Sequence, residues 1–250
     1  MDFIFGAAEL GIAMDIGERL LICGAEVSRV EDTITRICRA YGARRVDVFT
    51  ITSSIVVSAW GEDDVPFTQT RRVNGLATDL YALSELNDLS RRICSDHPGS
   101  REVARELARI DSRPRYSFRW HLFIWMLVSA SFSIFFGGSW RDALVSAVIG
   151  ILLKLLQAGL GKLKVNSLLS TLICSVAGGI GAYMAVGASL ADSVSSISIG
   201  NIMLLIPGIA LTNSIRDMFS GDTISGLLRF TEALILSIFI AWGFAIPAMF

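Results

Sequence analysis

The chain has 250 residues, of which 52% are hydrophobic and 18% charged, and its mean hydropathy is +0.57. This apolar balance is too high for an ordinary soluble domain and indicates membrane spans. Residues 1–115 hold 15 arginines against 18 acidic residues, and residues 116–250 hold 7 basic and 5 acidic residues. Such small net charges argue against a nucleic-acid partner. We expect a small cytoplasmic α+β domain over residues 1–115 and an α-helical transmembrane domain over residues 116–250.

Two helices are predicted at the start of the chain. The first covers residues 3–23. The second covers residues 26–41, where apolar residues recur at 3-4-3-4 spacing and arginines face outward. The recurring positions are Val27, Val30, Ile34, Ile37 and Tyr41. Gly24 and Gly42 follow the two helices and are typical C-terminal stops.

The pattern then changes to that of β-strands, rich in β-branched and aromatic residues. Three strands are predicted, over residues 46–51, 55–60 and 65–73. Pro66 lacks a backbone N–H and favours an edge position for the third strand. Two more helices are predicted over residues 78–94 and 101–110, with Ser100 as the N-cap of the second.

Five segments of the second half are long enough to cross a bilayer core, which needs about 20 apolar residues per helix. They cover residues 118–137, 143–163, 168–186, 197–215 and 227–248. Lys154 lies well inside the second segment and Glu232 about one turn into the fifth. Ionisable residues at such depth usually face a bundle interior or a water path. Lys154 also has the option of extending its amine toward the membrane surface.

Basic residues gather on one side of these five segments. They are Arg113, Arg115, Arg119, Lys162, Lys164, Arg216 and Arg229. By the positive-inside rule, the N-terminus is cytoplasmic and the C-terminus is periplasmic or external. No cleavable targeting peptide is evident at the N-terminus. We therefore expect a multi-pass protein of the cell inner membrane.

The stretch over residues 206–222 (IPGIALTNSIRDMFSGD) differs from the other apolar segments. Pro207 and Gly208 break the helix. The stretch also holds Asn213, Arg216 and Asp217. A broken helix in hydrocarbon is tolerated only against protein or a water-filled cavity, and such helices form substrate sites in transporters. The alternative is a kinked helix whose Arg216 and Asp217 mark the membrane edge.

Residue types that carry enzyme chemistry are scarce. His97 and His121 are the two histidines, and the four cysteines form no CxxC pair. A His-based triad or a metal-ligand set is therefore not expected. No nucleophile and base are paired within a span. We expect neither an enzyme nor a cofactor.

Two long runs of sequence carry a family resemblance. The first joins residues 17–25 (GERLLICGA) to residues 28–31 (SRVE), which include Arg29 and Glu31. The second covers residues 207–234 and includes Asp222 and Glu232. On these runs the chain resembles the threonine/serine exporter (ThrE) family over nearly all of its length. From the residues alone, Arg29 and Glu31 are more typical of a solvated helix face than of a functional surface.

The resemblance implies an exporter of small carboxylates, either threonine/serine-type amino acids or succinate-like dicarboxylates. Single-chain members continue into a second membrane domain, whereas this chain stops at Phe250. It is therefore expected to be similar to the YjjP-like large subunit of a split exporter. The implied partner is a separate small membrane subunit, and a homo-oligomer is also open. The alternative is a membrane-anchored sensor or assembly subunit with a ligand-binding cytoplasmic domain.

A transport path is expected from the family resemblance and from the depth of the ionisable residues. Its candidate residues are Pro207, Gly208, Asn213, Arg216, Asp217, Asp222, Lys154 and Glu232. The half-helix that begins after Pro207 and Gly208 would offer backbone N–H groups to a substrate carboxylate. Asn213 would add an amide donor, and Lys154 or Arg216 a cation.

Three of these candidates are carboxyl groups that are suited to proton coupling. They are Asp217, Asp222 and Glu232. A carboxyl group shielded from water titrates nearer neutral pH than a solvated one. A second interpretation pairs Arg216 with Asp217 at the cytoplasmic gate.

Overall fold

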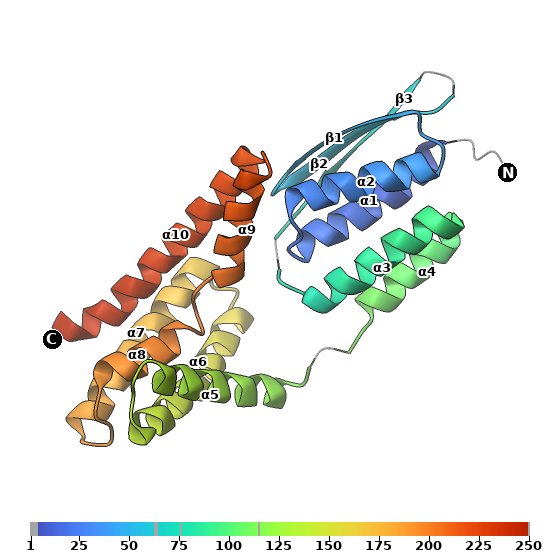
Figure 1. The fold of residues 1–250 in the computed structure, drawn as a ribbon. Coiled ribbons are helices and arrows are strands. Elements are labelled where there is room, and N and C mark those ends of the chain that lie inside the picture. The colour runs from blue at the N-terminus through green and yellow to red at the C-terminus, as the bar shows by residue number, and fades with distance from the viewer. Residues whose placement is uncertain (1–4, 63–64, 76, 115, 250) are drawn as a thin grey trace. The chain divides into compact units, whose positions relative to one another are not determined.

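The computed structural model describes all residues except 1–4, 63–64, 76, 115 and 250. The chain is mostly helical, with a three-stranded sheet in its N-terminal part, and it divides into two compact units (Figure 1). The first unit comprises Met1–Pro114 and Ile209–Thr231, and the second comprises Arg115–Gly208 and Glu232–Phe250. Residues 209–231, expected in the transmembrane domain, thus pack with the N-terminal part of the chain.

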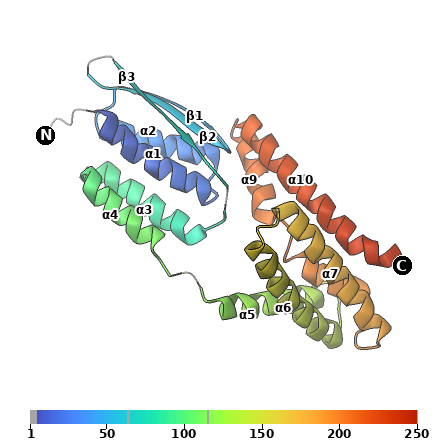
Figure 2. The same cartoon turned by 180° about the vertical axis from the view of Figure 1, so that it is seen from behind.

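The Met1–Pro114 part of the first unit has three layers. Its elements are α1 (Ala7–Ile22), α2 (Val27–Ala40), β1 (Arg45–Ile51), β2 (Ser54–Trp60), β3 (Pro66–Arg72), α3 (Leu80–Asp96) and α4 (Ser100–Asp111). Helices α1 and α2 cover one face of the sheet, and α3 and α4 pack on their other side (Figures 1 and 2). The predicted strands and helices of this region are confirmed to within a few residues.

The sheet is antiparallel in the order β1-β2-β3. Alternate residues of the central strand β2 are buried, because successive side chains of a strand point to opposite faces. These buried residues are Ile55, Val57 and Ala59. Pro66 opens β3 opposite Trp60, so the predicted edge position of this strand is confirmed.

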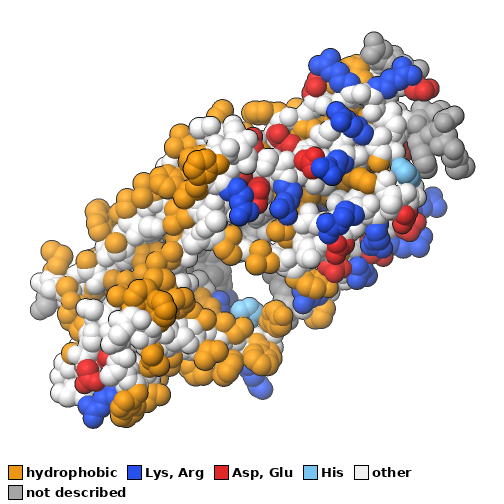
Figure 3. Space-filling model, viewed as in Figure 1, with side chains coloured by type: hydrophobic (Ala, Val, Ile, Leu, Met, Phe, Trp, Pro, Cys, Tyr) orange, Lys and Arg blue, Asp and Glu red, His pale blue; other side chains and the backbone are white. Residues whose placement is uncertain are grey.

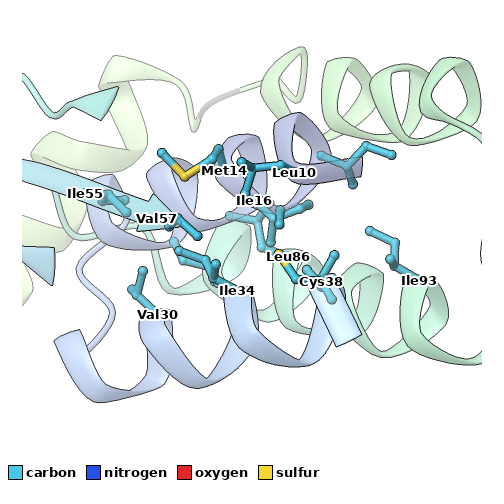
Figure 4. Close-up of a cluster of buried hydrophobic side chains, with 14 of the residues drawn as sticks. Leu10, Met14, Ile16, Val30, Ile34, Cys38, Ile55, Val57, Leu86 and Ile93 are labelled. Carbon is cyan, nitrogen blue, oxygen red and sulfur yellow. The ribbon is translucent and has the colours of Figure 1, made fainter. Parts of the chain in front are cut away.

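The core of the first unit is formed by the apolar face predicted for residues 26–41. Its five recurring residues are all buried, and they pack against α1, β2 and α3 (Figure 4). Gly17 lets α1 approach α2 closely, since a Cβ there would lie 2.5 Å from Ile34 Cδ1. The expected cap of α4 is wrong by one residue: Gly99 is the N-cap and Ser100 is the first helical residue.

The second unit is an assembly of apolar helices. They are α5 (Phe118–Phe135), α6 (Trp140–Lys162), α7 (Ser167–Gly187), α8 (Val194–Ile202) and the C-terminal part of α10 (Thr223–Ala245), followed by η1 (Ile246–Met249). Hydrophobic side chains dominate its visible surface, whereas charged side chains gather on the first unit (Figure 3). Among the described residues, four helices are long and apolar enough to cross a membrane: Phe118–Phe135, Trp140–Lys162, Ser167–Gly187 and Thr223–Met249.

The fourth expected span, residues 197–215, is not one continuous helix. Helix α8 ends at Ile202 and α9 (Gly208–Phe219) begins after a break at Pro207, so the predicted break is confirmed. The backbone donors of the break are paired within the chain. The N–H groups of residues 203–206 and of Gly208 donate to backbone carbonyls. The Gly208 N–H, for example, bonds to Ile206 O at 2.9 Å.

Candidate functional site

The structure divides the candidate residues between its two units. Six lie in the first unit, namely Arg29, Glu31, Asn213, Arg216, Asp217 and Asp222. Four lie in the second, namely Lys154, Pro207, Gly208 and Glu232. Within the first unit, the two sequence runs that carry the family resemblance meet each other.

The turn between α1 and α2 presents three backbone groups to this meeting point. Gly24 has a φ of +92°, a left-handed conformation that glycine adopts without strain. Glu26 is the N-cap of α2, but its side chain does not cap the helix. The first amide of α2, on Val27, therefore needs a partner from elsewhere in the chain.

Residues 209–231 supply a matching partner for each backbone group of the turn. Asn213 Nδ2 donates to Gly24 O at 3.0 Å, and Arg229 donates to Ala25 O at 3.1 Å. The Val27 N–H donates to Asp217 Oδ1 at 3.1 Å. An amide, a guanidinium and a carboxylate thus hold two carbonyls and one N–H, across nearly 200 residues of sequence.

Helix α9 and the start of α10 pack very closely against each other at this meeting point. Gly226 makes this approach possible, because a Cβ there would lie 2.7 Å from Ser214 O and 2.9 Å from Met218 N. We call the segment Ile209–Thr231 the α9–α10 hairpin. Its polar side chains face the α1–α2 turn from two helices, so the positions of both helices set the geometry of the site.

Two ion pairs strengthen the contact. The buried Asp217 and Arg229 approach to 3.5 Å, with exposed fractions of 0% and 5%. Arg216 pairs with Glu26 at the rim. The interpretation in which Arg216 and Asp217 pair with each other is therefore wrong, because each has its partner on another element.

A second set of carboxyl groups lies beside the buried pair. Glu31 Oε1 accepts a hydrogen bond from the Thr50 N–H at 2.7 Å, and Ser225 Oγ donates to Thr50 O at 3.4 Å. Burial raises the pKa of Glu31, and the charge of Asp222 adds to that shift. Burial also raises the pKa of Asp222. These groups take up protons more readily than solvated carboxylates do.

Asp217 has opposing influences on its charge. Burial raises the pKa of its carboxyl, and the nearby charges of Asp222 and Glu26 act in the same direction. Arg229 and the Val27 N–H stabilise the carboxylate and lower its pKa. The raising effect prevails, so protonation of Asp217 is easier than that of a solvated aspartate.

Three buried polar atoms at this meeting point have no hydrogen-bond partner among the described residues. They are Asp217 Oδ2, Arg229 Nε and Thr50 Oγ1. Burying an unsatisfied polar atom costs about 1–3 kcal/mol. The buried pair is therefore held in place by its backbone contacts but is not saturated with hydrogen bonds.

The candidates of the second unit lie at three separate places in the sequence and have fewer polar contacts. Lys154 is half-buried on α6, where its Nζ donates to Gln157 Oε1 at 2.9 Å and lies 4.6 Å from the centre of the Trp125 ring. Glu232 is exposed on α10. A Cβ on Gly208 would meet no atom within 4 Å.

A hydroxyl–amide cluster in the second unit was not predicted. Ser129, Ser146 and Asn201 are fully buried and join α5, α6 and α8. Ser129 Oγ lies 2.7 Å from Ser146 Oγ and 2.9 Å from Asn201 Oδ1, and Asn201 also donates to Ile197 O. An uncharged amide inside an apolar segment was the signal that could have revealed it, since such groups bond across membrane helices.

Comparison with known proteins identifies the family. The model of the threonine/serine exporter family, ThrE, matches residues 11–250. The chain belongs to this family. The predicted resemblance is therefore confirmed, and the chain is a multi-pass membrane protein of a transporter family.

The relatives differ in the share of their own length that this chain covers. The threonine/serine exporter of Corynebacterium glutamicum is 24% identical over 92% of this chain, which spans 49% of that protein. A protein of Mycobacterium tuberculosis that is named a probable threonine/serine exporter is 26% identical to this chain, which spans 45% of that protein. The chain thus spans about half the length of these two relatives.

A relative with another name is covered more fully. YjjP of Klebsiella aerogenes, named a probable succinate transporter subunit, is 26% identical over 88% of this chain, which spans 84% of that protein. No solved structure matches the chain.

Proposed function

We propose that this ThrE-family chain is a subunit of an exporter of small carboxylates, either threonine/serine-type amino acids or succinate-like dicarboxylates, in the cell inner membrane. The observation that carries the proposal is the family match over residues 11–250. This chain spans 84% of a relative that is named a transporter subunit. That coverage supports a separate small membrane subunit as its partner. The family is one of transporters, which is not an enzyme class.

The proposed topology has five crossings, of which the fourth contains the break between α8 and α9. Met1–Pro114 and Ile209–Thr231 form one compact unit, and a compact polar unit lies on one side of a membrane. The chain between residues 115 and 208 then crosses an even number of times. Three long apolar helices lie there, so α8 with its break makes the fourth crossing. Helix α10 then carries the C-terminus to the external side.

Accessibility labelling tests this topology with two matched exposed leucines. Leu190 follows α7 and Leu163 follows α6, with exposed fractions of 64% and 75%. We expect Leu190→Cys to react with a membrane-impermeant maleimide in intact cells. We expect Leu163→Cys to react only after the membrane is opened. Reaction of both variants, or of Leu163→Cys alone, in intact cells would contradict the orientation.

In the proposed mechanism, the substrate moves past the break and the charged residues beside it. Pro207 and Gly208 provide the opening, and Lys154 and Glu232 are ionisable groups on apolar helices. Asn213, Arg216, Asp217 and Asp222 belong to the α9–α10 hairpin, which joins the break to the α1–α2 turn through the polar contacts described above. Arg29 and Glu31 lie on α2, where Arg29 pairs with Glu26 and Glu31 accepts a hydrogen bond from the Thr50 N–H.

Efflux from liposomes tests this mechanism. We expect succinate or threonine efflux when the chain is reconstituted with its separate membrane subunit, and none from the chain alone. Gly208→Leu should bring efflux to the level of empty liposomes with normal membrane abundance, because a Cβ there meets no described atom within 4 Å and a longer side chain narrows the opening.

The matched control is Gly159→Leu on α6, which also meets no atom within 4 Å. It should leave efflux unchanged. Equal efflux from both variants would show that the break is not part of the path. Robust efflux from the chain alone would contradict the split exporter.

A further inference from the structure

The N-terminus of α2 holds a carboxylate that comes from the other end of the chain. Helix α2 has 14 residues, and its first amide, on Val27, donates to Asp217 Oδ1 at 3.1 Å. The guanidinium of Arg229 lies on the other oxygen of the same carboxylate. A helix N-terminus with an adjacent cation is a favourable place for an anion, since exposed N–H groups and the helix dipole both attract negative charge.

A second observation shows that this anion site is not saturated by its present occupant. Arg229 is 95% buried, yet its Nε has no partner among the described residues. Its NH1 lies 3.5 Å from Asp217 Oδ2, and that oxygen also accepts no hydrogen bond within the described chain. Arginine commonly binds a carboxylate through two parallel hydrogen bonds. Arg229 therefore retains an unused donor beside the Asp217 carboxylate.

We propose that Val27 and Arg229 form a binding site for a small carboxylate, and that Asp217 occupies it until a ligand carboxylate displaces it. The ligand carboxylate would take the Val27 N–H and the Arg229 guanidinium, including its free Nε. This inference deepens the proposed function and rests on it for the class of ligand, a small organic acid or amino acid.

Displacement leaves Asp217 without its two stabilising partners. The charged groups that remain around it are Glu26 on α2 and Asp222 at the turn of the hairpin, while Arg216 on α9 is paired with Glu26. The surroundings of the freed carboxyl are then mostly negative and poorly hydrated, and such surroundings favour the neutral acid. Asp217 therefore takes up one proton as the ligand carboxylate enters, and the net charge of the site does not change.

Calorimetric titration of the full chain in detergent with succinate tests this exchange, with the uncharged succinamide as control. We expect binding of succinate and not of succinamide, with uptake of about one proton per ligand, measured in buffers of different ionisation enthalpy. Between about pH 6.5 and 8.5, affinity should fall by up to about tenfold per pH unit, because one proton is bound with the ligand.

Variants distinguish whether Asp217 is displaced by the ligand or has only a structural role. Asp217→Asn removes the competing charge, so succinate should bind about tenfold or more tightly at the upper end of this range, without proton uptake. Asp32→Asn is the matched control and should retain proton uptake, because Asp32 is exposed on α2, where it pairs with Arg36. Arg229→Lys keeps the charge and loses the fork of donors, so binding should weaken.

Three results would overturn the site. These are no succinate binding to either wild type or Asp217→Asn, equal binding of succinamide, and weaker binding to Asp217→Asn than to wild type. The last result would mean that Asp217 helps to bind the ligand instead of occupying the site until the ligand displaces it. Efflux with the partner subunit is measured separately, so export without binding at this site would reject the site and leave the proposed function intact.

Discussion

Replacing Arg229 by methionine should lower the free energy of unfolding by about 3–5 kcal/mol, because it leaves the Asp217 carboxylate buried without a cation. The exposed fractions of 5% and 0% mean that water cannot take the place of the lost guanidinium. The substitution also removes the hydrogen bond to Ala25 O. Thermal unfolding of the purified chain in detergent, followed by tryptophan fluorescence, measures the effect.

The pH dependence of this defect has a definite sign. Burial already raises the pKa of Asp217, and loss of Arg229 removes a group that lowers it. A carboxyl group whose folded pKa is raised favours the fold below its unfolded pKa and loses that contribution as pH rises through the folded pKa. The loss of stability in Arg229→Met should therefore be smaller at mildly acidic pH than at alkaline pH.

A double variant provides the control. Asp217→Leu combined with Arg229→Met removes both charges, and replacing a buried pair by apolar residues of similar volume is often neutral or stabilising. We expect the double variant to recover most of the stability lost by Arg229→Met. If the single and double variants were equally unstable at every pH, the buried charge of Asp217 would not be the cause.

The second large effect is expected in the second unit, from Gly200→Ala. A Cβ on Gly200 would lie 2.6 Å from Ser129 O and from Ser146 Oγ, and 3.1 Å from Ser133 Cβ. A backbone oxygen cannot rotate away as the end of a side chain can, so α8 has to move away from α5. Overpacking of this kind typically costs about 1–3 kcal/mol, and here it also disrupts the hydrogen bonds of Asn201.

The matched control for this prediction is Gly159→Ala, the same substitution on a helix where no atom lies within 4 Å. Its unfolding temperature should equal or slightly exceed that of the wild type, because alanine favours helix more than glycine does. Detergent-solubilised yield and thermal unfolding distinguish the two variants. A Gly200→Ala protein as stable as Gly159→Ala would contradict the close packing of α8.

Burial of the α2 stripe and the apolar length of α5, α6, α7 and α10 could be predicted from local sequence. In each case the signal is a repeat or a run that lies within one element, and burial of that face follows directly. The break at Pro207 is local as well, because proline removes a helical hydrogen bond wherever it stands. The sequence by itself thus determined the mostly helical membrane class and the family.

The partners of the charged residues were decided only by the tertiary structure. Arg216 and Asp217 are neighbours in sequence, yet they point to Glu26 and Arg229. On a helix, successive side chains point in different directions, so adjacency in the chain does not predict a contact. The contacts of Asp217 and Arg229 with the α1–α2 turn span 190 and 204 residues, a separation that no local pattern encodes.

The same reason explains why the Ser129–Ser146–Asn201 cluster was missed. Serine and asparagine in an apolar segment become a network only when α5, α6 and α8 come together. Local sequence determined which groups are polar, and packing of distant segments decided which of them meet.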